Sequence, residues 1–282
     1  MIDHDWPEPP TGFVLRADGA GALYVAAPFE SALSARGLHA WEGWEAALAA
    51  GSSASGRGAT AVLDGGSGVR WRLKLMRRGG RLASVWRDRY PSARRLVSTL
   101  SASVEAQKRG VPTPDPVALI VKSGASGLMR AAMAFVEIEG SEDLARRVLR
   151  GGATPADLVA AIDAVRAMHD RGVSHPDVNL GNVLLRSRPD GSPEVWIIDF
   201  DRATFAPGPL PFGARQAALR RLERSCAKLT GAAGPWGPET ADVWYATYAA
   251  NDAGLARRLA GGRTLGRLAL AAHRLFWRRD TP

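Results

Sequence analysis

The sequence predicts an α+β protein of two lobes, a small and mainly β first lobe followed by a mainly helical second lobe. Strand-like segments are concentrated in the first half of the chain, whereas helical patterns predominate from Thr154 onward. A polar stretch, EIEGSED at 137–143, separates the two halves. At 282 residues the chain is long enough to form two compact lobes. We therefore expect a first lobe at 1–138 and a second lobe at 139–282.

Apolar runs and alternations mark the strands expected in the first lobe. Residues 60–76, TAVLDGGSGVRWRLKLM, predict a β-hairpin with the turn DGGSG, and its second strand alternates apolar with charged residues. This alternation places Lys74 on the face opposite the apolar side chains. Residues 117–121 and 128–137 predict two further strands. Between the hairpin and these strands, residues 91–110 have apolar positions at helical spacing and end in a glycine.

The second lobe is expected to begin with a helix that leads into a polar loop. Thr154, Pro155 and Asp157 form a helix start, with proline in the first turn and an acid three residues after the cap. The apolar stripe of this helix runs to the loop GVSHPDVNLGN at 172–182. Residues 182–200 then predict a hairpin around a Pro-Asp-Gly turn, which returns the chain to an acid. The rest of the chain is expected to be helical.

Composition excludes several classes of protein. With 46% hydrophobic residues the chain can bury a sizeable core, and its single cysteine, Cys226, excludes an internal disulfide and a cysteine-based zinc site. The first residues lack the basic-then-apolar order of a signal peptide, and no uncharged apolar run is long enough to cross a bilayer. We therefore expect a soluble, cytoplasmic protein that touches a membrane at most peripherally.

The chain is basic, with 37 Lys and Arg residues against 28 Asp and Glu residues, a net charge of +9. Such a surplus suits anionic partners, although arginines solvated on ordinary helix faces would give the same total. The densest basic group, RRGGR at 77–81, is either a contact for anionic head groups or a solvated turn. No nucleic-acid-binding motif accompanies the charge, so no nucleic-acid partner is expected.

The polar loop and the hairpin after it carry the residues that phosphoryl transfer requires. Asp177 and Asn182 are five residues apart, and Asp199 opens the sequence Asp-Phe-Asp after an apolar strand. Phosphoryl transfer needs a base near the acceptor hydroxyl and metal ions on the phosphates, and hard cations prefer carboxylate and amide oxygens. The protein-kinase pattern has the same Asp-to-Asn spacing, followed by a metal-binding aspartate. As a structural alternative, the three residues serve only as turn and cap residues.

Six sequence blocks follow one another along the chain: GRGATAV (56–62), WRLKLMRRGG (71–80), DRY (88–90), GVPTPDPVA (110–118), HPDVNLGNVLL (175–185) and WIIDFDRA (196–203). In this order they resemble one family, the lipopolysaccharide kinases, and within it the 3-deoxy-D-manno-octulosonic acid (Kdo) kinases. Together the blocks cover about residues 50–230, and HPD in place of HRD and DFDR in place of DFG are features of that family. The resemblance implies a protein-kinase-like fold and the use of ATP and Mg²⁺.

The resemblance also implies roles for individual residues. Asp177 would take or orient the proton of the acceptor hydroxyl, and Asn182 and Asp199 would hold Mg²⁺. Lys74 would reach the α- and β-phosphates of ATP. The remaining ATP contacts would be a phosphate-covering loop formed by Gly56, Arg57 and Gly58, where backbone N–H groups can approach closely, and the backbone near Val136 and Ile138 at the adenine.

Several of these residues have a structural reading as well. The GRG stretch lies in a small-residue segment that could be a flexible linker, and Lys74 could belong to a solvated strand face. His175 and His169 are expected to be packing and hydrogen-bonding residues. Protein kinases have alanine two residues before the lysine, where this chain has Arg72. The only acid on the helix at 91–110 is Glu105, six residues later than the pattern places the partner of the lysine.

The sequence therefore predicts an ATP-dependent phosphotransferase acting on a sugar hydroxyl of inner-core lipopolysaccharide, with Kdo on a lipid A precursor as the expected acceptor. It would work at the cytoplasmic face of the inner membrane, with peripheral contact to anionic lipid. The alternatives are a kinase for heptose or another small molecule, and a nucleotide-binding module without catalytic activity. The first and last ~50 residues suggest no function of their own.

Overall fold

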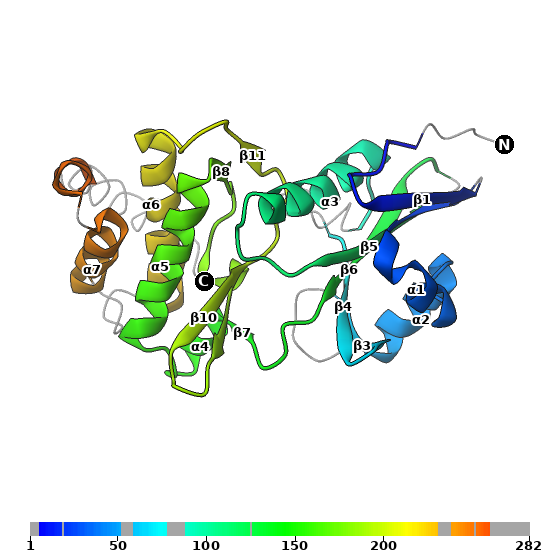
Figure 1. Ribbon diagram of the computed structural model, residues 1–282, viewed down its shortest axis with the longest axis horizontal. Helices are drawn as coiled ribbons and strands as arrows, with labels where there is room; N and C mark the ends of the chain where they lie inside the picture. The colour runs from blue at the N-terminus through cyan, green and yellow to red at the C-terminus, as the bar shows by residue number, and fades with distance from the viewer. Residues whose placement is uncertain are drawn as a thin grey trace, which may run out of the picture. The chain divides into compact units, whose positions relative to one another are not determined.

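The computed structural model describes residues 6–18, 20–51, 59–77, 88–124, 126–230, 238–250 and 252–259. The chain divides into two compact units (Figure 1). Unit 1 comprises Met1–Lys108 and Thr113–Glu139, and unit 2 comprises Arg109–Pro112 and Gly140–Pro282. The last crossing between the units lies one residue after the expected boundary at 138. The short excursion of residues 109–112 into unit 2 was not expected from the sequence.

The described part of unit 1 is built on a six-stranded antiparallel sheet. The predicted hairpin is present as β3 and β4, and its turn contains a register shift between Asp64 and Gly66. Lys74 pairs with Met133 and Arg72 with Phe135 across the β4–β6 ladder. In spatial order the strands are β1 (Phe13–Asp18), β2 (Gly21–Ala26), β5 (Pro116–Ser123), β6 (Met129–Val136), β4 (Val69–Leu75) and β3 (Thr60–Gly66).

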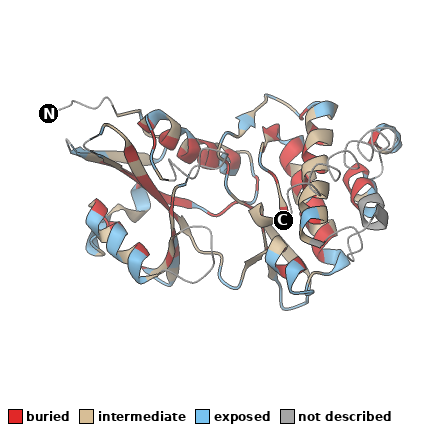
Figure 2. Cartoon of the chain, turned by 180° about the vertical axis from the view of Figure 1, so that it is seen from behind, coloured by how far each residue is buried: buried red, intermediate tan, exposed pale blue. Residues whose placement is uncertain are grey.

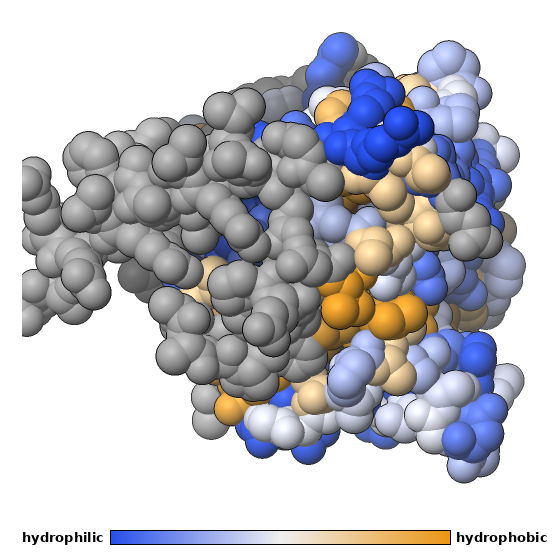
Figure 3. Space-filling view, turned by 90° about the vertical axis from the view of Figure 1, so that its left-hand side faces the viewer, coloured by the Kyte–Doolittle hydropathy of each residue, from blue (hydrophilic) through white to orange (hydrophobic). Residues whose placement is uncertain are grey.

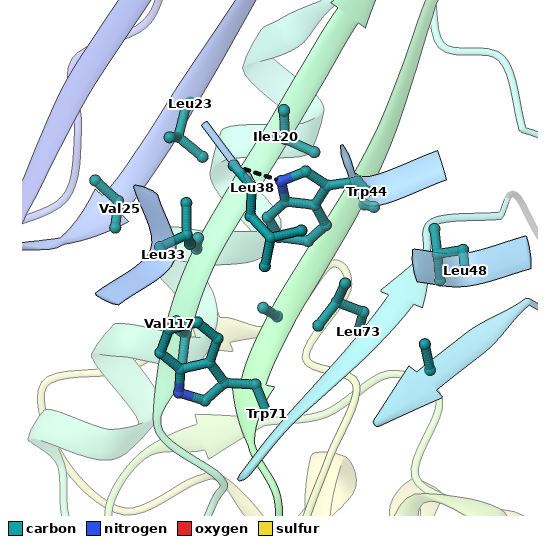
Figure 4. Close-up of a cluster of buried hydrophobic side chains, with 14 of the residues drawn as sticks. Leu23, Val25, Leu33, Leu38, Trp44, Leu48, Trp71, Leu73, Val117 and Ile120 are labelled. Carbon is teal, nitrogen blue, oxygen red and sulfur yellow. Dashed lines mark hydrogen bonds between the residues drawn. The ribbon is translucent and has the colours of Figure 1, made fainter. Parts of the chain in front are cut away.

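One face of this sheet is covered by the N-terminal helical segments η1 (Ala27–Phe29), α1 (Glu30–Ala35) and α2 (Trp41–Ala50). Figure 4 shows the core that they close, in which Trp44 and Trp71 are fully buried beside Leu73. The Trp44 indole N–H donates to the Leu38 carbonyl at 2.8 Å, so its polar atom is satisfied in an otherwise apolar site. The helical segments within residues 27–50 are therefore an integral layer of unit 1.

Helix α3 (Ala93–Lys108) covers the opposite face of the sheet. Its buried side chains, including Leu96 and Leu100, pack against Tyr24 and Met133. Residues directly opposite one another on neighbouring strands share a face, so Lys74, the partner of Met133, lies on the α3 face. The predicted helix at 91–110 and the predicted alternation around Lys74 are both present.

The described part of unit 2 is mainly helical, with short strands around the polar loop. Its helices are α4 (Leu144–Leu149), α5 (Pro155–Asp170), α6 (Phe212–Thr230) and α7 (Pro238–Ala249). The predicted α+β fold class, a mainly β first part and a mainly helical second part, is confirmed. The strands are β7 (Glu142–Asp143), β8 (Val173–Ser174), β9 (Val183–Ser187), β10 (Pro193–Ile197) and β11 (Thr204–Phe205), paired as β10–β9–β7 and β11–β8.

Buried ion pairs join α4, α5 and β7. Arg147 is 8% exposed, and its guanidinium lies 2.7 Å from the Asp157 carboxylate and 3.1 Å from that of Glu142. Asp157 also accepts from the backbone N–H of Thr154 at 2.8 Å, which completes the predicted capping box of α5. Glu142 lies on β7, which pairs with β9, so this cluster fixes the strand that follows the polar loop.

Buried residues gather inside each unit, and exposed residues lie on the outer helix faces (Figure 2). Seen from the side of α6 and α7, the described surface is mostly hydrophilic around a small hydrophobic area (Figure 3). Leu149 and Val243 are the large hydrophobic residues that are exposed in the described ranges. None of the helices in those ranges has the length and apolar character needed to cross a membrane.

Candidate active site

The polar loop of unit 2, residues 175–182, connects β8 to β9 and is held by alternating buried residues. Val178 and Leu180 are buried, whereas Asp177 is exposed. The Leu180 backbone N–H donates to the Ser225 hydroxyl of α6 at 3.3 Å. The loop thus presents its acid to solvent while apolar neighbours fix its backbone.

His175 connects this loop to the end of β10. Its Nδ1 accepts from the Asp177 backbone N–H at 3.2 Å, so the neutral ring carries its proton on Nε2, which donates to the Ile198 carbonyl at 3.0 Å. The ring also packs on Phe200, with centroids 5.2 Å apart. Burial lowers the pKa of His175, although the Ile198 carbonyl and the nearby acids oppose this shift. His175 is therefore a neutral, fully hydrogen-bonded connector, the structural role expected from the sequence.

Two side-chain amides fix the backbone of Asp177. Asn182 Nδ2 donates to the Asp177 carbonyl at 2.9 Å, and Asn179 Nδ2 donates to the same oxygen at 2.8 Å. Because this bond uses its amide nitrogen, Asn182 has its Oδ1 as the remaining polar atom for another ligand. Asn179 Oδ1 accepts from the Gly181 N–H at 2.9 Å. Sequence reasoning missed Asn179, and the Asx-type spacing to Gly181 is the signal that could have found it.

Asp199 lies two residues after the buried end of β10. The Ile198 backbone N–H donates to the Asn182 carbonyl at 3.0 Å, so the residue before Asp199 is joined to the end of the loop. Asp199 is exposed and has a φ of 69°, in the left-handed region. A non-glycine residue held there costs about 1–3 kcal/mol, and such strain is characteristic of functional sites. The structure therefore joins Asp177, Asn182 and Ile198, the residue before Asp199, in one hydrogen-bonded assembly.

The donors in this assembly fit a magnesium ion. Asn182 and Asp199 offer one amide and one carboxylate oxygen, the hard ligands that Mg²⁺ prefers when substrate phosphates and water complete its shell. Across the described ranges, no group of three or more His, Cys, Asp or Glu residues is placed to hold a metal by itself.

In unit 1 the arginine that departs from the kinase pattern has a partner. The Nε and one terminal nitrogen of Arg72 each lie 2.5 Å from the Glu137 carboxylate, which forms a bidentate pair between β4 and the end of β6. Sequence reasoning missed Glu137, because 65 positions separate it from Arg72 and no local pattern links them. Glu105 lies on α3, and its pairing with Lys74 stays a prediction.

The segment after β6 offers backbone groups to a ligand. Val136 donates its N–H to the Asp115 carbonyl, and Glu137 donates to the Arg70 carbonyl, both at 2.8 Å. The N–H and C=O of Ile138 make no hydrogen bond to another described residue. Both Val136 and Ile138 stay predicted adenine contacts. Gly56, Arg57, Gly58 and most of RRGGR lie outside the described residues, so their expected roles stay predictions.

An α+β chain in which an Asp–Asn loop precedes a hairpin and a further acid has the organisation of a protein-kinase-like phosphotransferase. A model of the family described as Lipopolysaccharide kinase (Kdo/WaaP) matches residues 42–243, well over half of the chain. The chain belongs to the lipopolysaccharide kinase (Kdo/WaaP) family. The resemblance noted in the sequence is confirmed.

Curated proteins similar to this chain include enzymes named 3-deoxy-D-manno-octulosonic acid kinase. The protein of Pasteurella multocida (strain Pm70) is 31% identical over 182 residues, which are 62% of this chain and 74% of that protein. That of Haemophilus influenzae (strain PittEE) is 30% identical over 187 residues, 64% of this chain and 76% of that protein. A solved structure described as WaaP in complex with acyl carrier protein covers 86% of this chain and 98% of its own, with 19% identity and a TM-score of 0.48.

Proposed function

We propose that this chain transfers the γ-phosphate of ATP to a sugar hydroxyl of inner-core lipopolysaccharide, and that its acceptor is Kdo on a lipid A precursor. The family assignment and the Kdo kinase relatives at about 30% identity support the reaction and the acceptor. The observation that carries the mechanism is the hydrogen-bonded assembly of the polar loop with the residues around Asp199.

Asp177 is the base in this proposal. Its backbone is held on both sides, by His175 at the N–H and by two amides at the carbonyl, while its carboxylate remains exposed. A carboxylate carried on a backbone fixed in this way starts close to the position from which it can accept the proton of a sugar hydroxyl.

ATP and Mg²⁺ complete the proposed site. Asn182 Oδ1 and the Asp199 carboxylate would hold Mg²⁺, which neutralises charge that develops on the transferred phosphate. Lys74 would pair with the α- and β-phosphates, and the backbone of Val136 to Ile138 would bind the adenine. Gly56, Arg57 and Gly58 would cover the phosphates.

Phosphate transfer to a Kdo–lipid A acceptor tests the proposal. With Mg-ATP as donor, we expect incorporation by the wild type and a loss of about 10²–10⁴-fold in rate for Asp177→Ala, because the base is removed. Asp190→Ala is the matched control, since Asp190 is an acid of the β9–β10 turn that bonds Ser192 and lies outside the assembly. A wild type that transfers no phosphate, or an Asp177→Ala variant with full activity, would refute the proposal.

Other acceptors and a non-catalytic role are separated by the same assay. A panel with heptose-containing core fragments and small aminoglycosides identifies a different acceptor if one of them is preferred. The replacement of the usual alanine by Arg72, and its pair with Glu137, favour the alternative of a nucleotide-binding module without catalysis. Nucleotide binding without turnover on any acceptor in the panel would support that module.

The acceptor proposed is a glycolipid, so the enzyme would work at the cytoplasmic face of the inner membrane through peripheral contact with anionic lipid. The net charge of +9 supports such contact. Co-sedimentation with vesicles that contain anionic lipid, decreasing as salt is raised, is the expected result. Equal binding to purely zwitterionic vesicles would contradict an electrostatic attachment.

A further inference from the structure

The short segment of residues 109–112 belongs to unit 2, although the chain on both sides of it belongs to unit 1. It follows α3 directly, since α3 ends at Lys108, and it precedes the extended run that leads to β5. Gly110, with a φ of 76°, provides the turn that takes the chain out of the helix. Residues 109–112, here called the excursion, therefore make their contacts within unit 2.

The excursion contacts both ends of the stretch that contains Asp199, residues 197–206, here called the acid segment. At the first end, the Ile197 N–H donates to the Pro112 carbonyl at 2.8 Å, two residues before Asp199. At the second end, Arg109 donates to the Ala206 carbonyl, and its guanidinium lies 5.2 Å from the centre of the Phe205 ring. The acid segment is therefore held from outside at both of its ends.

Arg109 also ties the acid segment to the residues between α5 and β8, which lead into the polar loop. The same terminal nitrogen donates to the Arg171 carbonyl at 3.2 Å, and the Ala206 N–H donates to the Gly172 carbonyl at 2.8 Å. A Cβ at Gly172 would lie only 2.5 Å from the Ala206 carbonyl oxygen and 3.1 Å from the Arg109 guanidinium. The backbone at Gly172 therefore packs against the Arg109 guanidinium, and a side chain at this position would clash with the Ala206 carbonyl.

We propose that Arg109 is a positioning residue of the kinase, which holds the acid segment so that Asp199 keeps its left-handed conformation beside Asn182. This inference rests on the proposed role of Asp199 as a Mg²⁺ ligand. A strained residue persists only where its surroundings fix it, and here a planar guanidinium with several donors fixes two carbonyls and an aromatic ring at once. Arg109 directly follows Lys108, the last residue of α3, so the residue proposed to position Asp199 is the first residue after that helix.

Two measurements on full-length variants test this proposal. The first is amide hydrogen exchange of the peptide that covers the acid segment, and the second is the Mg²⁺ concentration that half-saturates ADP binding in calorimetry. For Arg109→Ala we expect faster exchange in that peptide and a Mg²⁺ requirement raised roughly 10–100-fold, the usual cost of losing a residue that orients a metal ligand. Arg109→Lys, which keeps the charge and a donor, should recover part of both effects.

Arg188→Ala is the matched control, because Arg188 is an exposed arginine of the β9–β10 turn whose side chain lies 3.7 Å from the Glu194 carboxylate. It should show the exchange and the Mg²⁺ requirement of the wild type. If Arg109→Ala does not fold, Phe205→Leu, which removes the ring that the guanidinium packs on, should raise the Mg²⁺ requirement in the same direction. Unchanged values in folded Arg109→Ala, or equal shifts in Arg188→Ala, would overturn the inference.

These results separate the inference from the proposed function. If the wild type transfers phosphate and Arg109→Ala keeps the wild-type exchange and Mg²⁺ requirement, the inference fails and the function stands. If the wild type transfers none, while ADP binding depends on Mg²⁺ and shifts in Arg109→Ala, the function fails and the inference stands. Nucleotide binding that is independent of Mg²⁺ in the wild type overturns the inference by itself.

Discussion

His169 and His175 are both buried in unit 2, but their ring nitrogens are satisfied to different extents. Both nitrogens of His175 are hydrogen-bonded, to the Asp177 N–H and the Ile198 carbonyl. His169 Nδ1 is 2.6 Å from the Tyr248 hydroxyl, whereas its Nε2 is buried without a partner among the described residues. Protonation would therefore change the stability of the folded state through different contacts at the two histidines.

Protonation of His169 should make stability depend on pH. Burial, the main cause, and the positive charge of nearby Arg215, the second cause, lower the pKa of His169 to about 3, from an ordinary value of 6.5. Between about pH 6.5 and pH 3, His169 is therefore protonated in the unfolded chain but neutral in the folded chain. The free energy of unfolding consequently falls as the pH falls through this range. The expected contribution is about 2 kcal/mol between pH 7 and pH 5.

Urea unfolding of the wild type and His169→Gln over that pH range measures this contribution. Glutamine can still accept from Tyr248 but does not titrate, so the variant should lose about 2 kcal/mol less stability than the wild type on going from pH 7 to pH 5. His175, Asp170 and Arg215, which also act on His169, are the same in both proteins. Parallel pH profiles for the two proteins would show that His169 does not carry the effect.

At the scale of elements, the ion cluster between α4, α5 and β7 holds the helical part of unit 2 to the strand beside β9. Arg147→Met should destabilise the protein by about 3–5 kcal/mol, because it leaves the buried Asp157 carboxylate without its cation. Arg146→Met is the matched control on the same helix. Arg146 is exposed and lies 3.5 Å from Asp143, so its loss should cost no more than about 1 kcal/mol.

Chemical denaturation of both variants, followed by circular dichroism, gives these differences directly. A loss for Arg147→Met as small as that for Arg146→Met would mean that water reaches the cluster and screens it. In that case β7 would be positioned by its two-residue pairing with β9, and the cluster would be a surface feature.

Local patterns predicted those elements whose signals lie close together in the sequence. The hairpin at β3 and β4 followed from strict alternation, and the start of α5 followed from a cap and an acid three residues apart. The layer of α1 and α2 was harder to interpret, although Trp41, Trp44 and Leu48 repeat at the spacing of one helix face. Periodicity shows that a face is apolar, but it does not show which sheet the face covers.

At the scale of the whole molecule, sequence spacing selected the candidate site residues, whose roles stay predictions, but it did not predict the contacts around them. Asp177, Asn182 and Asp199 were selected by order and distance along the chain. Hydrogen bonds join the Asn182 amide to the Asp177 carbonyl and Ile198, the residue before Asp199, to the Asn182 carbonyl. The partners of Arg72 and Arg109 lie 65 and 97 positions away. Long-range pairs of this kind depend on how the chain folds back, which a single sequence does not display.

The path of the chain also limits how the molecule can be divided. Because residues 109–112 are part of unit 2, a cut after Glu139 yields two polypeptides that do not coincide with the two units. The C-terminal piece would lack Arg109, which donates to the Ala206 carbonyl, and Pro112, whose carbonyl accepts from the Ile197 N–H. A split or transplanted version would therefore have to recover these four residues by reassociation, or carry them as a grafted loop.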